Sequence, residues 1–229
     1  MPRSCDMEDS REYPLTPLQQ GMVYHSLMFP RSGAYIQQLV GDLYEHLDVP
    51  RFKEAWQNTA ALHPVLRTRF HQDAGGDFSQ YVANDAEFEW AEEDWSHLGC
   101  YDCDAMWQRY LAEDRSRGFD LSDTPLMRLA LVRMPHNDNC FLWTYHHALL
   151  DGRSQFRVLK DLFGFYDALI EGGEYQAEDS PAFREHVLWL GRQDKEPARQ
   201  FWRESLKGFE AATQVTVALP GDDAESCVD

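Results

Sequence analysis

The stretch FLWTYHHALLDGRS, residues 141–154, joins a run of mostly apolar residues to two histidines, an aspartate and a glycine. The apolar run predicts a buried strand that ends at the histidines. Successive strand residues point to opposite faces of a sheet, so His146 and His147 cannot both face one cavity. We therefore expect one histidine to face a site and the other to pack and hydrogen-bond in the interior.

Neutral histidine is the usual proton acceptor near neutral pH, because its unperturbed pKa is about 6.5. Asp151 follows a short turn and can order the loop through a buried pair with an arginine. Gly152 allows close backbone approach or a positive φ, and its N–H can face a developing oxyanion. The simpler alternative is a pair of strand-end histidines followed by an ordinary turn.

The sequence contains no serine or cysteine in a GxSxG nucleophile elbow. A zinc site is also disfavoured, because HHxxxD lacks the one-face helical spacing and the third ligand of such sites. Cys100 and Cys103 have CxxC spacing without a second pair, which indicates unpaired thiols. These patterns favour a histidine acting as a base on an exogenous nucleophile, with no metal.

The chain has 39 acidic and 21 basic side chains, which give a net charge of −18. Such a field repels nucleic acid and anionic lipid. No apolar run approaches the ~18 residues of a membrane-spanning helix, and the N-terminal residues include no signal-peptide core. We therefore expect a cytoplasmic protein that binds neither nucleic acid nor a membrane.

Strand and helix patterns alternate through the whole chain. Strands are predicted at 35–47, 65–72, 77–83, 88–95, 125–134 and 140–147, with turns at 74–77 and 135–139. Helices are predicted after Thr16 and Asp48 as N-caps, at 104–117, from Gly152 or Ser154, from Pro181, and at 195–208. This mixture predicts an α/β (α+β) two-layer sandwich, a mostly antiparallel sheet covered by helices.

Four segments together carry a resemblance to a known family. YHHALLDGRS resembles the HHxxxDG signature of condensation domains of nonribosomal peptide synthetases, which chloramphenicol acetyltransferase-type enzymes share. YPLTPLQQGMVYHSL resembles the family's first core motif. HPVLRTRF resembles the second, RHExLRTxF, with Leu62 and Pro64 in place of its first Arg and its Glu.

FREHVLWLGRQ and FWRESLKG resemble the region of the fourth motif, where Phe183, Glu185 and His186 replace Tyr, Asp and an aromatic residue. The order of the motifs holds over residues 13–208. The resemblance implies a chloramphenicol acetyltransferase-like half. We expect a flexible N-terminus at 1–12, one subdomain at 13–212, and at 213–229 an acidic tail or the start of a link to a second half.

The resemblance also implies roles for individual residues. His147 would be the catalytic base that orients or deprotonates the amine of an acceptor aminoacyl thioester, which attacks a donor thioester. His146 would be its buried support, and Gly152 would line the substrate tunnel.

Three further residues would be structural. Asp151 would pair with Arg67 in a buried ion pair. Trp202 stands where the family has a Phe-Trp pair, and core packing is its simplest interpretation.

In this family both substrates are carried on phosphopantetheine arms of carrier proteins, so the domain itself would bind no cofactor directly. Family members span roughly twice this chain, and no second-half motif follows Gly208. The resemblance therefore implies an N-terminal half that needs the C-terminal half for full activity. Two alternatives stay open: a non-catalytic module that binds carrier proteins or the synthetase, and a self-associating CoA- or carrier-dependent acyltransferase whose site forms with another copy of itself.

Overall fold

The structure is a computed structural model that describes residues 11–30, 32–44, 47–73, 75–85, 87–135 and 139–211. The predicted tail at 213–229, residues 1–10, and residues 136–138 of the predicted turn lie outside these ranges. The chain divides into two compact units, Met1–Gly191 and Arg192–Asp229. The two units are described separately below.

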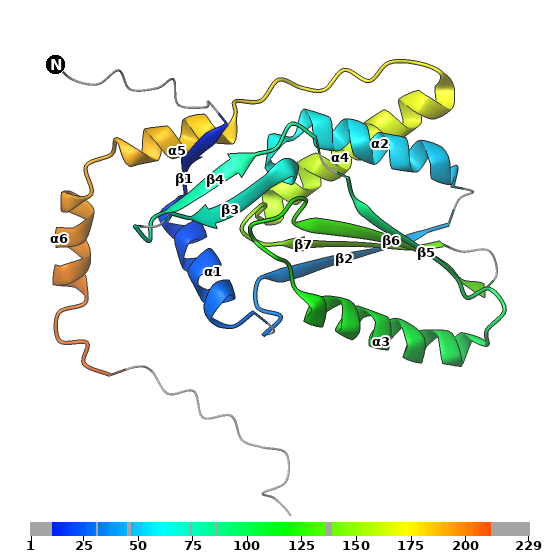
Figure 1. Cartoon of the computed structure of the whole chain (residues 1–229), viewed down its shortest axis with the longest axis horizontal. Coiled ribbons are helices and arrows are strands. Elements are labelled where there is room, and N and C mark those ends of the chain that lie inside the picture. The colour runs from blue at the N-terminus through cyan, green and yellow to red at the C-terminus, as the bar shows by residue number, and fades with distance from the viewer. Residues whose placement is uncertain are drawn as a thin grey trace, which may run out of the picture. The chain divides into compact units, whose positions relative to one another are not determined.

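The first unit contains strands and helices in alternation, as Figure 1 shows. In chain order they are β1 (Glu12–Pro14), α1 (Pro17–Met28), β2 (Ile36–Leu43), α2 (Val49–Leu62), the 3₁₀ helix η1 (Pro64–Arg67), β3 (Thr68–Gln72), β4 (Phe78–Val82), β5 (Glu89–Asp94), α3 (Cys100–Arg117), β6 (Met127–Arg133), β7 (Asn139–His146), α4 (Gly152–Glu171) and α5 (Phe183–Gly191). The second unit contains α6 (Glu196–Ser205).

The strands form two sheets. The larger has the order β2-β7-β6-β5, in which β7 runs antiparallel to both neighbours and β5 runs parallel to β6. The smaller has the order β1-β4-β3 and is antiparallel throughout. The predicted fold class, a mostly antiparallel α/β arrangement covered by helices, is confirmed, and the structure adds the division into two sheets.

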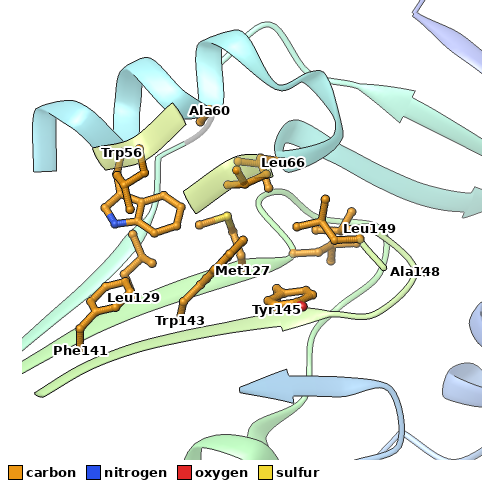
Figure 2. Close-up of a cluster of buried hydrophobic side chains, with 14 of the residues drawn as sticks. Trp56, Ala60, Leu66, Met127, Leu129, Phe141, Trp143, Tyr145, Ala148 and Leu149 are labelled. Atoms are coloured by element: carbon orange, nitrogen blue, oxygen red, sulfur yellow. The ribbon is translucent and has the colours of Figure 1, made fainter. Parts of the chain in front are cut away.

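One face of the larger sheet packs against α2 and α4 (Figure 1). Leu129 of β6 and Phe141 and Trp143 of β7 point to this face, with the two-residue period of a strand. Trp56 of α2 packs on Phe141 and Trp143, with ring centroids 5.9 and 5.0 Å away, as the cluster in Figure 2 shows. These large aromatic rings supply much of the buried apolar area that holds the layers together.

The opposite face of the larger sheet packs against α3. Val132 of β6 and Cys140 of β7 are buried there in a second cluster with Cys103 of α3. Because both faces are covered, β6 and β7 read in the sequence as almost continuous apolar runs rather than as alternating ones.

A buried polar network joins α3 to the strands beneath it. The Asp114 carboxylate of α3 accepts hydrogen bonds from Arg128 of β6, from Thr144 of β7 (2.7 Å) and from Gln38 of β2 (2.8 Å). Burial alone would raise the pKa of Asp114, but the hydrogen bonds from Arg128 and Thr144 hold that pKa below its usual value. The carboxylate is therefore ionised and fully engaged, which fixes how α3 lies on the sheet.

Several element boundaries differ from those that the sequence predicts. Glu12 belongs to β1 and pairs with Tyr81, so the predicted flexible N-terminus is wrong at this residue. The first part of the strand predicted at 65–72 is the 3₁₀ helix η1, because Pro64 favours a turn. The Thr68 hydroxyl stabilises this turn by donating to the Pro64 carbonyl at 3.1 Å. The helix predicted at 104–117 begins four residues earlier, at Cys100.

Removing the Asp114 carboxylate tests the network beneath α3. We expect Asp114→Ala to lower the free energy of unfolding by roughly 3–5 kcal/mol, because it leaves Arg128 buried without its charge partner. Glu92→Ala is the matched control, since Glu92 pairs with Lys53 at the surface and its loss should cost less than about 1 kcal/mol. Urea denaturation measures both, and equal costs would contradict the buried network.

Candidate active site

The loop after β7 is anchored at both ends. The His147 N–H donates to the Tyr35 carbonyl at 2.7 Å, which extends the pairing of β7 with β2 by one residue. The Ala148 carbonyl accepts from Gln19 Nε2 of α1 at 3.0 Å. Ala148 and Leu149 are buried in the core cluster, where Figure 2 shows them on the loop that leaves Tyr145. The path of the loop is therefore set by hydrogen bonds and burial together.

His146 points into the interior, as strand geometry predicts, with 1 % of its surface exposed. The Ala148 N–H donates to its Nδ1 at 3.2 Å, so the ring hydrogen is on Nε2, which lies 3.0 Å from Ser26 Oγ. Burial, and to a smaller extent the charge of His147, lowers the pKa of His146 to about 4. His146 is thus a neutral, hydrogen-bonded support at neutral pH.

His147 is half-buried and lines a cavity. Its Nδ1 lies 2.7 Å from the Leu150 carbonyl, which can only accept a hydrogen bond, so Nδ1 carries the proton. Nε2 therefore holds the lone pair, and it has no hydrogen-bond partner among the described residues. A neutral imidazole with a fixed tautomer and an open Nε2 can accept a proton from a bound nucleophile.

The cavity beside His147 has a volume of about 1580 Å³ and is walled entirely by the first unit. Its walls come from the start of β1 and α1, the end of α2, the histidine loop, the first turns of α4, and α5. The lining contains apolar side chains together with a few polar groups that include His63, His147, Arg157 and His186. This combination of an apolar lining with a few polar groups is typical of small-molecule sites.

Asp151 is the N-cap of α4, which begins at Gly152, one of the two starting residues that the sequence predicts. Its carboxylate accepts from the backbone N–H of Arg153 at 3.2 Å and of Ser154 at 2.8 Å. Hydrogen bonds from Ser154 lower the pKa of Asp151, which is ionised at the positive end of the helix. Asp151 thus orders the start of α4 by capping it.

The predicted ion pair between Arg67 and Asp151 is wrong. Arg67 donates instead to backbone carbonyls: Nε to Ala60 at 2.8 Å, Nη1 to Ala83 and Asn84, and Nη2 to Ala61 at 3.3 Å. The end of α2 and the segment after β4 supply these acceptors, so the guanidinium fastens backbone to backbone. Arg67 keeps a structural role, with different partners.

Gly152 lines the cavity, but neither close backbone approach nor a positive φ accounts for the glycine. It is the first residue of α4, its φ is not positive, and a Cβ there would meet no atom of the chain within 4 Å. Nothing within the described part of the chain therefore requires glycine at this position.

Trp202 lies on α6 in the second unit and is 58 % exposed. Its ring contacts that of Phe201, with centroids 5.2 Å apart. The interpretation of Trp202 as a core-packing residue is therefore wrong for the described chain.

Two supports of the histidines were not found by sequence reasoning. Tyr35, whose carbonyl holds the His147 N–H, has φ of 61°, a left-handed conformation that is uncommon for an aromatic residue. Gln19 closes the capping box with Thr16 and reaches the histidine loop as well. The Thr-x-x-Gln spacing is a signal for the capping box, whereas no sequence signal marks Tyr35.

No group of three or more His, Cys, Asp or Glu side chains within the described residues is arranged to hold a metal ion. No helix in the part of the chain that the structure describes is both long and apolar enough to cross a membrane.

The pH dependence of stability tests the buried state of His146. Between pH 6.5 and about 4 the unfolded chain binds a proton that folded His146 does not bind. We therefore expect the stability advantage of the wild type over His146→Gln to shrink by roughly 3 kcal/mol as pH falls through this window. Denaturation curves at several pH values measure it, and a difference that stays constant would contradict a buried neutral histidine.

A double-mutant cycle tests the separate roles of Asp151 and Arg67. Asp151→Ala should cost about 1 kcal/mol through the lost cap, and Asp151→Asn less, because asparagine also caps helices. Since the two side chains share no partner, the effects of Asp151→Ala and Arg67→Ala should add within about 0.5 kcal/mol. A coupling energy of several kcal/mol between the two substitutions would instead support a direct ion pair between Arg67 and Asp151.

The chain matches the family described as "Condensation domain" over residues 9–227. Among curated proteins, it is 39 % identical over 204 residues to a linear gramicidin synthase of Brevibacillus parabrevis, covering 89 % of this chain and 4 % of that protein. It is 35 % identical over 199 residues to bacitracin synthase 3 of Bacillus licheniformis, covering 86 % of this chain and 3 % of that protein.

Solved structures agree on the fold. The starter condensation domain of rhizomide synthetase RzmA superposes with a TM-score of 0.75 at 18 % identity, covering 88 % of this chain and 49 % of that one. The first condensation domain of the calcium-dependent antibiotic synthetase gives a TM-score of 0.76 at 20 % identity, covering 87 % and 48 %. The chain thus spans about half the length of these solved domains. With the family match and the relatives above, these findings show that the chain belongs to the condensation domain family of nonribosomal peptide synthetases.

Proposed function

We propose that this chain is the N-terminal half of a condensation domain that forms an amide bond between two carrier-bound thioesters in nonribosomal peptide synthesis. The observation that carries the proposal is the open Nε2 of His147, a residue that lines a large cavity and whose tautomer is fixed by the Leu150 carbonyl. A base that must act on an exogenous amine needs this combination of fixed orientation and free access.

The proposed reaction needs one proton acceptor beside the attacking nitrogen. The α-amine of the acceptor thioester attacks the carbonyl carbon of the donor thioester, a C–N bond forms, and the C–S bond breaks. His147 Nε2 accepts the proton that the nitrogen loses and passes it to the departing thiolate, which leaves as a thiol, so the imidazole returns to its neutral form. The Leu150 carbonyl favours the charged ring while it exists, because it accepts the hydrogen bond from Nδ1.

Gly152 is our candidate for stabilising the tetrahedral oxygen. The Asp151 carboxylate accepts from the N–H groups of Arg153 and Ser154, which leaves the Gly152 N–H at the cavity wall for this task. Asp151 acts on this step by fixing the first turn of α4.

The ligands we propose are phosphopantetheine arms of peptidyl and aminoacyl carrier proteins, which bring both substrates. The domain then needs no cofactor of its own. The cavity suits such an arm, because it is large, mostly apolar and walled by several elements of the first unit.

A second half of the domain is the partner that we expect on α1. The exposed surface of this helix carries large apolar side chains, which is unusual on a free surface: Leu18, Tyr24, Leu27, Met28 and Phe29. The chain also spans only 49 % of a solved condensation domain. We infer that the remaining half covers this surface and completes the site.

Peptide formation tests the proposal directly. The chain, mixed with a separately produced C-terminal half and with loaded donor and acceptor carriers, should form dipeptide. His147→Ala should lower the rate about 10²-fold or more, because it removes the proton acceptor. His97→Ala is the matched control, since this histidine is exposed and does not line the cavity.

Other outcomes separate the alternatives. Full activity of His147→Ala would favour a carrier-binding module, and activity of a self-associated chain without the second half would favour a small acyltransferase. No product from folded components in any combination would reject the proposal.

A further inference from the structure

A second histidine of the cavity is held by a buried carboxylate. Asp161 of α4 is 1 % exposed and accepts from His63 Nε2 at 2.7 Å, from the Tyr175 hydroxyl at 2.7 Å and from Arg157 Nε at 3.3 Å. Burial alone would raise the pKa of Asp161, but hydrogen bonds from Tyr175 and His63 hold that pKa below its usual value. The carboxylate is therefore ionised, and both of its oxygens act as acceptors.

The ionised carboxylate fixes the tautomer of His63. Since Asp161 can only accept, Nε2 of His63 must carry a hydrogen, and in the neutral ring Nδ1 holds the lone pair. Nδ1 has no hydrogen-bond partner among the described residues, and it is not among the buried polar atoms that lack one. His63 lines the cavity, so it resembles His147 in offering one oriented acceptor nitrogen.

The two histidines lie at different positions along the cavity. His147 precedes the start of α4, whereas His63 is bound to Asp161, nine residues after Gly152 on that helix. Nine helical residues rise about 13 Å. Ser154, Arg157 and Val158 of α4 line the cavity, and α2 lies beside α4 (Figure 1). A ligand that contacts both histidines must therefore span from the loop before α4 to the helix turn that holds Asp161.

We infer that His63 is a substrate-binding residue of this cavity, whose Nδ1 accepts a hydrogen bond from an N–H or O–H group of an extended thioester ligand. The inference rests on the proposed function, because that function supplies the ligand. A pantetheine arm carries amide N–H and hydroxyl groups away from its sulfur, and the acyl part of the substrate is the other source of such donors. Asp161 is then a positioning residue, since it orients the ring without reaching the ligand.

A purely structural role would not account for the open nitrogen. Holding α2 against α4 needs only the hydrogen bond from His63 Nε2 to Asp161. Tyr175 and Arg157 also donate to Asp161, from other positions. A further acceptor on a cavity-lining residue favours a bound ligand only if the ligand donates a hydrogen bond to it in place of water.

Nitrogen-15 NMR of the histidine-labelled chain tests the inference. The free protein should show His63 with its proton on Nε2. Adding S-acetyl pantetheine should shift the His63 Nδ1 signal, whereas an N-acetylcysteamine thioester, which lacks the outer part of the arm, should perturb His147 alone. If the short thioester shifts His63 as well, the donor lies in the acyl part, and the hydrogen bond still stands.

Two variants separate binding from structure, because each removes one hydrogen bond to Asp161. His63→Leu should weaken pantetheine binding about 3- to 10-fold, the worth of one hydrogen bond. Tyr175→Phe is the matched control and should change it less than about 2-fold, since Tyr175 does not line the cavity. If His63→Leu does not fold, the change in the His63 Nδ1 chemical shift of the wild-type protein on adding S-acetyl pantetheine is the deciding measurement.

Three results would overturn the inference: a proton on His63 Nδ1 in the free protein, equal losses of affinity in both variants, or S-acetyl pantetheine that perturbs His147 and leaves His63 unchanged. The proposed function survives each of them. If no thioester changes the nitrogen-15 signals of either His63 or His147, the inference and the proposed function are both contradicted.

Discussion

Burial of β7 on both faces is the constraint on which the site depends. Phe141 and Trp143 are covered by the helices α2 and α4, and Cys140 is covered by α3. The strand therefore cannot shift its register or turn over without exposing apolar side chains of one face. A shift of one residue would exchange His146 and His147 between the interior and the cavity. The register of β7 with β2, in which Ile36 faces His146, therefore decides which imidazole can meet a substrate.

Backbone carbonyls and a buried carboxylate then decide what each imidazole can do. Leu150 fixes the proton of His147 on Nδ1, and Asp161 fixes that of His63 on Nε2. In both rings the remaining nitrogen is an acceptor at the cavity. His146 is the opposite case, because both of its ring nitrogens have partners in the interior. Three histidines with similar intrinsic chemistry are thus assigned different tasks by their neighbours.

The stretch that joins the histidines to α4 is stabilised by capping rather than by an ion pair. Asp151 bonds to the first free N–H groups of the helix, and Arg67 satisfies carbonyls at the end of another. Both side chains thus hydrogen-bond to backbone groups that would otherwise lack a partner at helix ends. This arrangement holds the loop rigid at its C-terminal side while Tyr35 and Gln19 hold the other side.

The sequence by itself determined most of the element types, although not β1 or η1, together with the caps at Thr16 and Asp48, the opposite orientations of His146 and His147, and the family. These features depend on the strand period, on capping chemistry and on short motifs, all of which are local. Only the tertiary structure decided the partners of Arg67 and Asp151, the left-handed Tyr35 and the pairing of His63 with Asp161. Residues 63 and 161 are far apart in the chain, and no local preference encodes which distant group a side chain meets once the sheets and helices have packed.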